Sequence, residues 1–461
     1  MNTQTAISPS AKNPARPFVS TRNACKLCAP LGASLVFRGI EGCVPLVHGS
    51  QGCATYIRRY IISHFKEPMD IASSNFSEQA AIFGGADNLR IALDNLTSQY
   101  RPAAIGIAST CLSETIGDDV AHYLEQYKAS KEGEDIPALI HAVTPSYRGT
   151  HMEGYHEAVR ATVRRLAVGG PRVRRLNLMP GFLSAADLRH LKAIMDDFHI
   201  LYTMLPDYSE TLDGESWADY QKLSPGGTPI SAIRAMGRAV GTIQFGKTLA
   251  GLETAATDLD TSFGIRAVTL GLPIGIGETD GFFHALEELT GVATPPKYEK
   301  ERGRLVDSYI DGHKYLFGKR AVIFGEADFV AAMAAFVTEI GMTPALCATG
   351  SAVKGFRETV FAGLAGRHED VRVEGDTDFE NMLEMCRPID ADLLIGNSKG
   401  YYLSKNLNVP LVRVGFPIHD RMGGQRIRHV GYGGTQELFD RIVNALIESK
   451  QSRSAIGYSY I

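Results

Sequence analysis

Short apolar runs alternate with amphipathic stretches along most of the chain, which is the pattern of β-strands alternating with α-helices. The predicted strands are residues 103–108, 138–143, 173–178, 200–205, 268–272, 320–324, 343–347, 392–395 and 410–414. The helices predicted around them are residues 56–64, a short one at 77–83, 86–100, 120–130, 155–166, 185–198, 230–238, 279–289, 298–309, 328–340, 379–386 and 435–448. Residues 33–39 and 44–47 are either strands or short helical pieces.

Strands this apolar, separated by helices, are typical of parallel sheets that are covered on both faces. The pattern therefore predicts an α/β protein with mostly parallel sheets. A polar segment with proline and serine, residues 1–16, is expected to be a flexible arm. Three α/β domains are then expected at residues 17–170, 171–310 and 311–461, the first of which carries most of the cysteines.

Composition excludes several classes of function. The 461 residues are 44% hydrophobic and 21% charged, and 47 Lys and Arg oppose 51 Asp and Glu for a net charge of −4. This balance argues against a nucleic-acid or membrane-surface binder. No apolar run reaches the roughly 18 residues that a membrane span needs, and the first residues lack the apolar segment of a secretory signal. The expected compartment is the cytoplasm.

Cysteines are concentrated near the start of the chain. The seven are Cys25, Cys28, Cys43, Cys53, Cys111, Cys347 and Cys386. An odd number in a reducing compartment argues against a disulfide framework. We interpret Cys25, Cys43, Cys347 and Cys386 as small buried hydrophobic residues. Cys25 and Cys28 also form a Cys-x-x-Cys pair, but no second pair completes a zinc site.

Three cysteines lie in settings that suit a metal centre. Cys53 ends the glycine-containing run 48–53 (His-Gly-Ser-Gln-Gly-Cys) and precedes the predicted helix 56–64, so it is expected near a helix N-terminus, where a thiolate is stabilised. Cys28 lies beside small residues, and Cys111 follows the strand 103–108, at the end where α/β proteins bind ligands. A shared cluster and three unrelated buried cysteines are both open interpretations.

Other chemistry finds little support. The turn 325–327 follows a strand and opens a helix but lacks the Gly-x-Gly-x-x-Gly fingerprint, and no Walker loop occurs. A nucleotide site is therefore not expected, and no Ser-His-Asp arrangement for nucleophilic catalysis can be recognised in the sequence.

Several short motifs follow one another along the chain. They are residues 48–53, Arg59, His64, Phe65, Glu67, Pro68, 83–85 (Phe-Gly-Gly), 110–111 (Thr-Cys), 114–119 (Glu-Thr-Ile-Gly-Asp-Asp), 144–146 (Thr-Pro-Ser) and 415–418 (Gly-Phe-Pro-Ile). Together they resemble the β-type subunit of the nitrogenase component 1 family. The resemblance implies that family's fold: three Rossmann-like domains, each a doubly wound parallel sheet.

The resemblance also implies a cofactor and a partner chain. In that family α and β chains form an α2β2 heterotetramer, and three cysteines from each hold an [8Fe-7S] P-cluster between them. Cys28, Cys53 and Cys111 fall on the β-side positions, with Cys53 on the one that bridges the cluster halves. Ser146 falls on the serine that can ligate the oxidised cluster. A [4Fe-4S] cluster is the alternative.

The catalytic cofactor is expected elsewhere. Family α subunits anchor an iron–molybdenum-type or iron-only cofactor through a cysteine and a histidine, and residues 112–346 contain no cysteine. No catalytic residue is therefore expected in this chain, which would be the electron-relay subunit of an oxidoreductase. Phe83 falls on the hydrophobic face where the ATP-dependent iron protein docks.

The substrate is open among related classes. Residues 26–35, 62–65 and 70–74, and an arm of only 27 residues before Cys28, look more like nitrogenase-like methylthio-alkane reductases, which cleave C–S bonds for sulfur salvage. We expect that activity. A dinitrogen-reducing β subunit and a cofactor-assembly scaffold are the alternatives. The presence of all three cysteines and Ser146 favours a catalytic protein over a scaffold, and over the protochlorophyllide-reductase type with its aspartate ligand.

Overall fold

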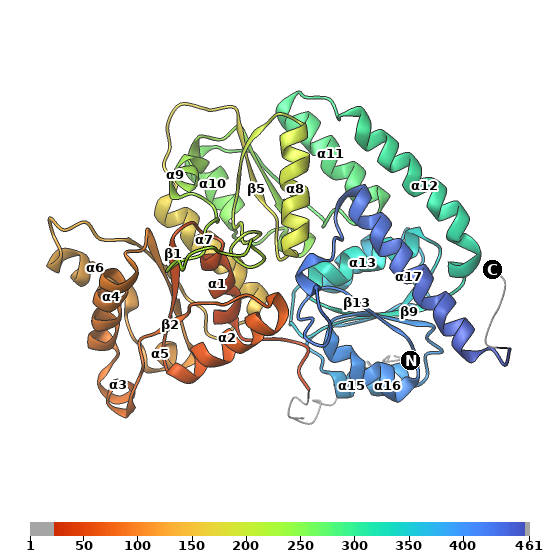
Figure 1. Ribbon diagram of the computed structural model, residues 1–461, viewed down its shortest axis with the longest axis horizontal. Coiled ribbons are helices and arrows are strands. Elements are labelled where there is room, and N and C mark those ends of the chain that lie inside the picture. Colours follow the sequence, from red (N-terminus) through yellow and green to blue (C-terminus); the bar gives the residue numbers. More distant parts are fainter. Residues whose placement is uncertain (1–22, 457–461) are drawn as a thin grey trace, which may run out of the picture.

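Three parallel sheets organise the computed structural model, which describes residues 23–456 (Figure 1). The first sheet has the order β2 (Ala72–Ser73), β1 (Cys43–His48), β3 (Ala104–Ser109) and β4 (Ala138–Ala142). The second has the order β6 (Leu201–Met204), β5 (Arg175–Met179), β7 (Gly241–Phe245) and β8 (Ala267–Leu270). The third has the order β11 (Arg372–Glu374), β10 (Thr343–Thr349), β9 (Arg320–Gly325), β12 (Leu393–Gly396) and β13 (Leu411–Arg413).

Helices separate the strands, as the alternating pattern predicts. Around the first sheet they are α1 (Ala29–Arg38), α2 (Gln51–Phe65), α3 (Glu78–Phe83), α4 (Ala86–Tyr100), α5 (Cys111–Ile116), α6 (Val120–Ser130) and α7 (His151–Leu166). The next are α8 (Ala185–Asp197), α9 (Ile230–Arg234), α10 (Ala255–Phe263), α11 (Ile276–Thr290) and α12 (Pro296–Leu316). The last are α13 (Ala327–Glu339), α14 (Phe356–Ala362), α15 (Phe379–Cys386), α16 (Tyr401–Leu407) and α17 (Gly431–Arg453).

The α/β fold class with parallel sheets is confirmed. Each sheet uses strands from one continuous part of the chain, and in Figure 1 the three sheets lie at the left, the top and the right. The domain limits themselves stay a prediction. Helix α12 runs without a break through residues 310 and 311, where the sequence places a limit, and it packs along α17. The expected arm, residues 1–16, lies outside the described residues.

Residues 33–39, which the sequence left open between a strand and a short helix, lie almost entirely in helix α1. All ten of its residues are buried, so no polar face marks it as a helix. It packs very closely on α7 through two glycines. A Cβ atom at Gly32 would lie 1.7 Å from the backbone oxygen of His151, and one at Gly154 would lie 2.0 Å from the backbone oxygen of Ala29. Only glycine permits this backbone approach.

Three strands of the sheets were not predicted from the sequence. They are β2, β7 and β11. Strand β7 is central in its sheet, but its sequence Gly-Thr-Ile-Gln-Phe mixes a glycine and two polar residues into a short run. Its Gln244 is buried and its Gly241 packs against Leu289, so tertiary packing rather than β-propensity makes this segment a strand.

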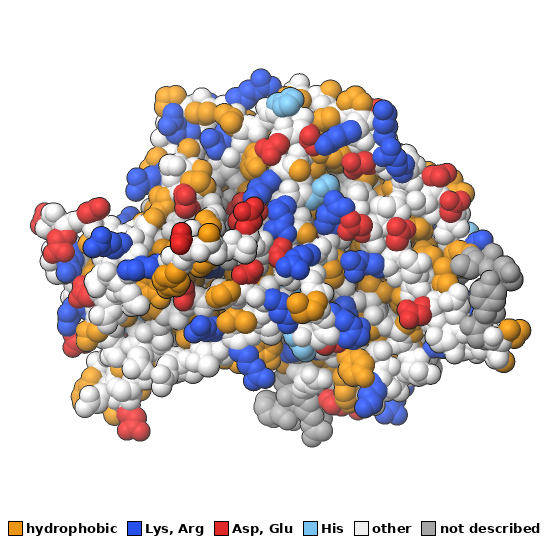
Figure 2. Space-filling model, viewed as in Figure 1, with side chains coloured by type: hydrophobic (Ala, Val, Ile, Leu, Met, Phe, Trp, Pro, Cys, Tyr) orange, Lys and Arg blue, Asp and Glu red, His pale blue; other side chains and the backbone are white. Residues whose placement is uncertain are grey.

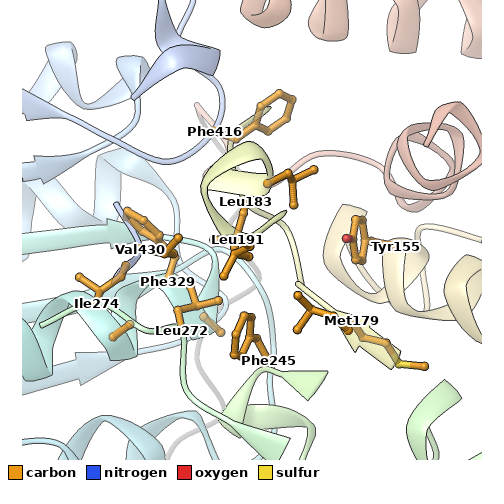
Figure 3. Packing of buried hydrophobic residues seen from close by; sticks show 14 of the residues in the cluster. Tyr155, Met179, Leu183, Leu191, Phe245, Leu272, Ile274, Phe329, Phe416 and Val430 are labelled. Carbon is orange, nitrogen blue, oxygen red and sulfur yellow. The ribbon is translucent and has the colours of Figure 1, made fainter. Parts of the chain in front are cut away.

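The sheets meet in a common hydrophobic core (Figure 3). Tyr155 reaches it from α7, Leu183 and Phe245 from the second sheet's region, and Phe329 and Phe416 from the third. Because these apolar side chains from distant parts of the chain share one core, their burial holds the three sheets together. Among residues 23–456 no helix combines the length and the apolar character needed to cross a bilayer.

Histidine hydrogen bonds fasten the same junction. The backbone N–H of Ile418 donates to Nδ1 of His64 at 2.9 Å, which joins α2 to the segment 415–418. His429 Nδ1 lies 2.7 Å from the Asp187 carboxylate, and His151 Nε2 lies 3.1 Å from Glu326. Two of the motifs that carry the family resemblance therefore meet at His64, 354 residues apart in the sequence.

Acid is expected to destabilise the fold through histidines that are buried or half-buried. Burial lowers the pKa of His64 to about 3, from 6.5, and the pKa values of His141 and His156 to about 4. The unfolded chain takes up a proton near pH 6.5, whereas folded His64 does not until about pH 3. Stability is thus lost as the pH falls from about 6.5 to about 3 for His64 and to about 4 for His141 and His156, at up to about 1.4 kcal/mol per pH unit for each histidine.

Calorimetry of a His64→Asn variant between pH 7.5 and 4.5 measures this dependence. An asparagine oxygen can accept the Ile418 hydrogen bond without titrating, so the variant's melting temperature should fall less steeply with acid than the wild type's. A His122→Asn variant, which changes an exposed histidine, should keep the wild-type slope. Equal slopes in His64→Asn and wild type would contradict the role of His64.

Candidate metal centre

Each of the three predicted cysteines stands at the N-terminus of a helix. Cys28 is the N-cap of α1, Cys53 is the third residue of α2, and Cys111 is the first residue of α5. The positive end of a helix dipole and its free N–H groups stabilise a thiolate. The sequence predicted this position for Cys53 alone, because α5 is only six residues long and α1 lacks a polar face.

The parallel first sheet brings these helix ends to one edge. Cys53 follows β1, Cys111 follows β3 and Ser146 follows β4, and the three strands are neighbours. The carboxyl ends of neighbouring parallel strands face the same side, where α/β proteins bind ligands. Cys28 is joined to this edge by an isolated bridge with Thr150.

Hydrogen bonds place Ser146 between two of the cysteines. Its backbone N–H donates to the Cys111 sulfur at 3.1 Å, and its hydroxyl oxygen accepts from the backbone N–H of Ala29, next to Cys28, at 3.1 Å. Burial raises the pKa of the Cys28 thiol to about 11, and the nearby sulfurs of Cys53 and Cys111 add to the rise. The four predicted residues therefore lie in one region of the molecule.

The remaining cysteines are ordinary core residues. Cys25, Cys43, Cys347 and Cys386 are buried, whereas Cys28 and Cys53 are half-buried and Cys111 is exposed. Burial raises the pKa of Cys43 to about 12 and that of Cys386 to about 11, which keeps these thiols protonated. All seven cysteines are free thiols in this structure.

The donor set suits an iron–sulfur group better than a single ion. It consists of three sulfurs and one hydroxyl, which are ligand types found on iron–sulfur clusters. Within residues 23–456 no group of three or more histidine, cysteine or acidic side chains converges on the position of one metal ion. Three sulfurs distributed along one sheet edge could hold a group with several iron atoms better than a single ion.

Behind the Cys53 turn lies a buried polar network. The His48 side chain is fully buried, with Nε2 3.1 Å from the Asp118 carboxylate and Nδ1 3.1 Å from the Ser74 hydroxyl. That hydroxyl accepts from the backbone N–H of Gly49 at 3.0 Å. One arrangement of protons satisfies every bond: Nε2 donates to Asp118, and Nδ1 accepts from Ser74.

Asp118 collects hydrogen bonds from several segments. Besides His48, its carboxylate accepts from the backbone N–H of Gly85 at 3.0 and 3.2 Å, and Tyr123 lies 3.4 Å away. Burial by itself would raise the pKa of Asp118, but the hydrogen bonds from His48 and Gly85 lower it below its usual value. The carboxylate is therefore held ionised although its side chain is only 2% exposed.

His48 and Asp118 both belong to motifs that carry the family resemblance, but the sequence alone assigns them no role. A histidine beside a glycine turn and an aspartate after a short helix have no spacing that marks them as partners, since 70 residues separate them. Only the pairing of β1 with β3 brings the two turns together. Ser74 belongs to the run 70–74 named above, and the sequence likewise assigns it no role.

Comparisons with known proteins identify the family. Residues 28–447 match the family described as nitrogenase component 1 type oxidoreductase. The chain is 37% identical over 430 residues to a nitrogenase molybdenum-iron protein beta chain of Clostridium pasteurianum, covering 92% of this chain and 93% of that one. It is 36% identical over 448 residues to the corresponding chain of Frankia alni, covering 93% and 83%.

A solved structure agrees. The structure titled "Nitrogenase Cp1 at pH 6.5" superposes with a TM-score of 0.93 at 34% identity, covering 98% of this chain and 99% of that one. The family's three-sheet architecture is therefore the architecture of this protein. The chain belongs to the nitrogenase component 1 family of oxidoreductases, as a β-type subunit.

Proposed function

We propose that Cys28, Cys53, Cys111 and Ser146 form the β-side half of a P-type iron–sulfur site that is completed by an α-type chain in an α2β2 complex. The single observation that carries the proposal is the set of three thiols at helix N-termini on one sheet edge. An iron–sulfur cluster bound there supplies one-electron transfer between an ATP-dependent iron protein and a cofactor in the α chain.

This chain's own residues prepare the site. The high pKa of Cys28 makes its thiolate costly unless a cation compensates for burial, and iron supplies that compensation. The Ser146 N–H donates to the sulfur of Cys111, which stabilises the thiolate form. The Ser146 hydroxyl lies at the same edge, available as an additional oxygen ligand.

The iron protein is proposed to dock at the segment 78–85, here called the docking segment: α3 with Gly84 and Gly85. Phe83 is 85% exposed and its neighbour Ile82 is 74% exposed. Figure 2 shows hydrophobic side chains at the lower left edge, where Figure 1 places α3. Two adjacent apolar side chains this exposed favour a protein contact.

For the substrate, we propose methylthio-alkanes, with C–S bond cleavage in the α partner. The support is the likeness of residues 26–35, 62–65 and 70–74 to the methylthio-alkane reductases. Dinitrogen reduction is the second candidate, because the relatives at 34–37% identity are named nitrogenase molybdenum-iron protein beta chains.

Metal analysis and a substrate comparison test this proposal. The purified complex should contain iron, and with its iron protein and ATP it should reduce dimethyl sulfide and ethyl methyl sulfide at least about tenfold faster than dinitrogen. Molybdenum content identifies the partner's cofactor. Ammonia as the main product would establish the dinitrogen-reducing alternative, and iron without turnover of either substrate class would favour the scaffold.

A further inference from the structure

One carboxylate connects the docking segment to two of the cysteine-bearing turns. Asp118 accepts the Gly85 N–H at the end of the docking segment and the His48 Nε2 proton at the end of β1. It lies seven positions after Cys111, and its own N–H donates to the oxygen of Ser113 in α5 at 3.0 Å. The Asp118 side chain therefore anchors the docking segment and the end of β1, and its backbone N–H ties the same residue to α5.

The contact at Gly85 leaves little room for movement. A Cβ atom there would lie 2.3 Å from the Phe76 ring and 2.7 Å from the Asp118 carboxylate, so glycine alone permits the approach. The Phe76 ring meets the His48 ring edge to face, with 4.8 Å between centroids. Packing and hydrogen bonding thus hold the docking segment directly against the groups behind the Cys53 turn.

Further bonds carry the connection to the cysteines. Gly49 is linked to His48 through the Ser74 hydroxyl, and the chain reaches Cys53 four residues later. Thr110, the N-cap of α5 and neighbour of Cys111, donates its hydroxyl to the His48 backbone oxygen at 3.0 Å. A displacement of the docking segment would therefore also shift the N-termini of α2 and α5, which carry Cys53 and Cys111.

We infer that Asp118 is a positioning residue that fixes the docking segment relative to the Cys53 and Cys111 turns, so that a protein seated on Phe83 acts on both sulfurs through this carboxylate; this rests on the function proposed above. Asp118 touches neither cysteine, so it tunes electron delivery through the groups it holds. Its predicted role is to couple docking to productive electron transfer.

An Asp118→Asn variant tests this role in the complete complex with its iron protein and ATP. The amide keeps the size of the side chain but removes its charge. Because both carboxylate oxygens accept from the Gly85 N–H, the amide NH2 opposes that N–H, donor against donor, whichever way the group turns. We expect unchanged iron content and an unchanged KM for the iron protein, with kcat about tenfold lower and ATP consumed per electron delivered at least about twofold higher.

The adjacent carboxylate provides the control. Asp119 is exposed and caps α6 by accepting from the backbone N–H of His122, with no bond to the docking segment. An Asp119→Asn variant should keep wild-type coupling. A milder variant, Ser74→Ala, removes the bond behind His48 and should give a smaller rise in ATP per electron, which keeps the test valid if Asp118→Asn does not assemble.

The outcomes separate this role from the proposed function. A wild-type complex without iron would remove the proposed function and, with it, the role of Asp118. Iron present with unchanged ATP per electron in Asp118→Asn and Ser74→Ala would overturn the role of Asp118 alone. A higher KM with unchanged kcat would also overturn it, because Asp118 would then only shape the docking surface.

Discussion

Replacing Cys53 by alanine is expected to strip or rearrange the iron–sulfur cluster of the complex and to lower substrate reduction at least about 100-fold. Cys53 lies in the first turn of α2, and the family resemblance implies that it takes the position that bridges the cluster halves. An alanine offers no ligand there. Iron analysis and EPR spectroscopy of the purified complex measure the effect.

A buried cysteine of the first sheet, Cys43, is the control. Cys43 begins β1, is 2% exposed, and has a pKa raised to about 12 by burial, so it is a core residue and not a ligand. A Cys43→Ala variant should lose about 1 kcal/mol of stability while keeping its iron. If Cys53→Ala kept the iron content and EPR spectrum of the wild type, Cys53 would not be a ligand.

Replacing Phe83 by aspartate is expected to raise the KM for the iron protein at least about tenfold, with the clusters intact. A charge placed in the centre of an apolar contact must be desolvated without a partner, which opposes docking. Iron content and the EPR spectrum should match the wild type, because Phe83 points into solvent and contributes nothing to the buried core. Turnover measured against iron-protein concentration gives the KM.

The matched control carries the same substitution at a distant site. Phe317 is 68% exposed and follows α12, a helix that lies on the opposite side of the molecule from α3 in Figure 1. A Phe317→Asp variant should keep the wild-type KM. Normal turnover at low iron-protein concentration in Phe83→Asp would remove the docking assignment.

The periodic pattern was sufficient for the fold class. Long apolar strands such as β9 and amphipathic helices such as α4 show their type locally, because burial on both faces or on one face leaves a direct mark on residue choice. The pattern failed where burial was complete or the element short. Helix α1 has no exposed face, and β7 is a strand because its neighbours on both sides pair with it.

For the candidate site, the sequence by itself determined which residue types are present: three thiols beside small residues and a serine after a strand, placed in the first domain. Their likeness to one family added the expected ligand roles. Neither the residue types nor the family resemblance showed that Cys28 and Cys111, like Cys53, stand at helix N-termini. Helix starts depend on capping geometry and packing as well as on composition.

Only the tertiary structure decided what surrounds the thiols. Parallel pairing of β1 with β3 brings His48 to Asp118, and the turn at Gly85 closes onto the same carboxylate. Such contacts join residues with no periodic relation in the chain, so no local pattern encodes them. The sequence thus determined the ligand types of the site, while long-range packing determined how the docking segment is tied to them.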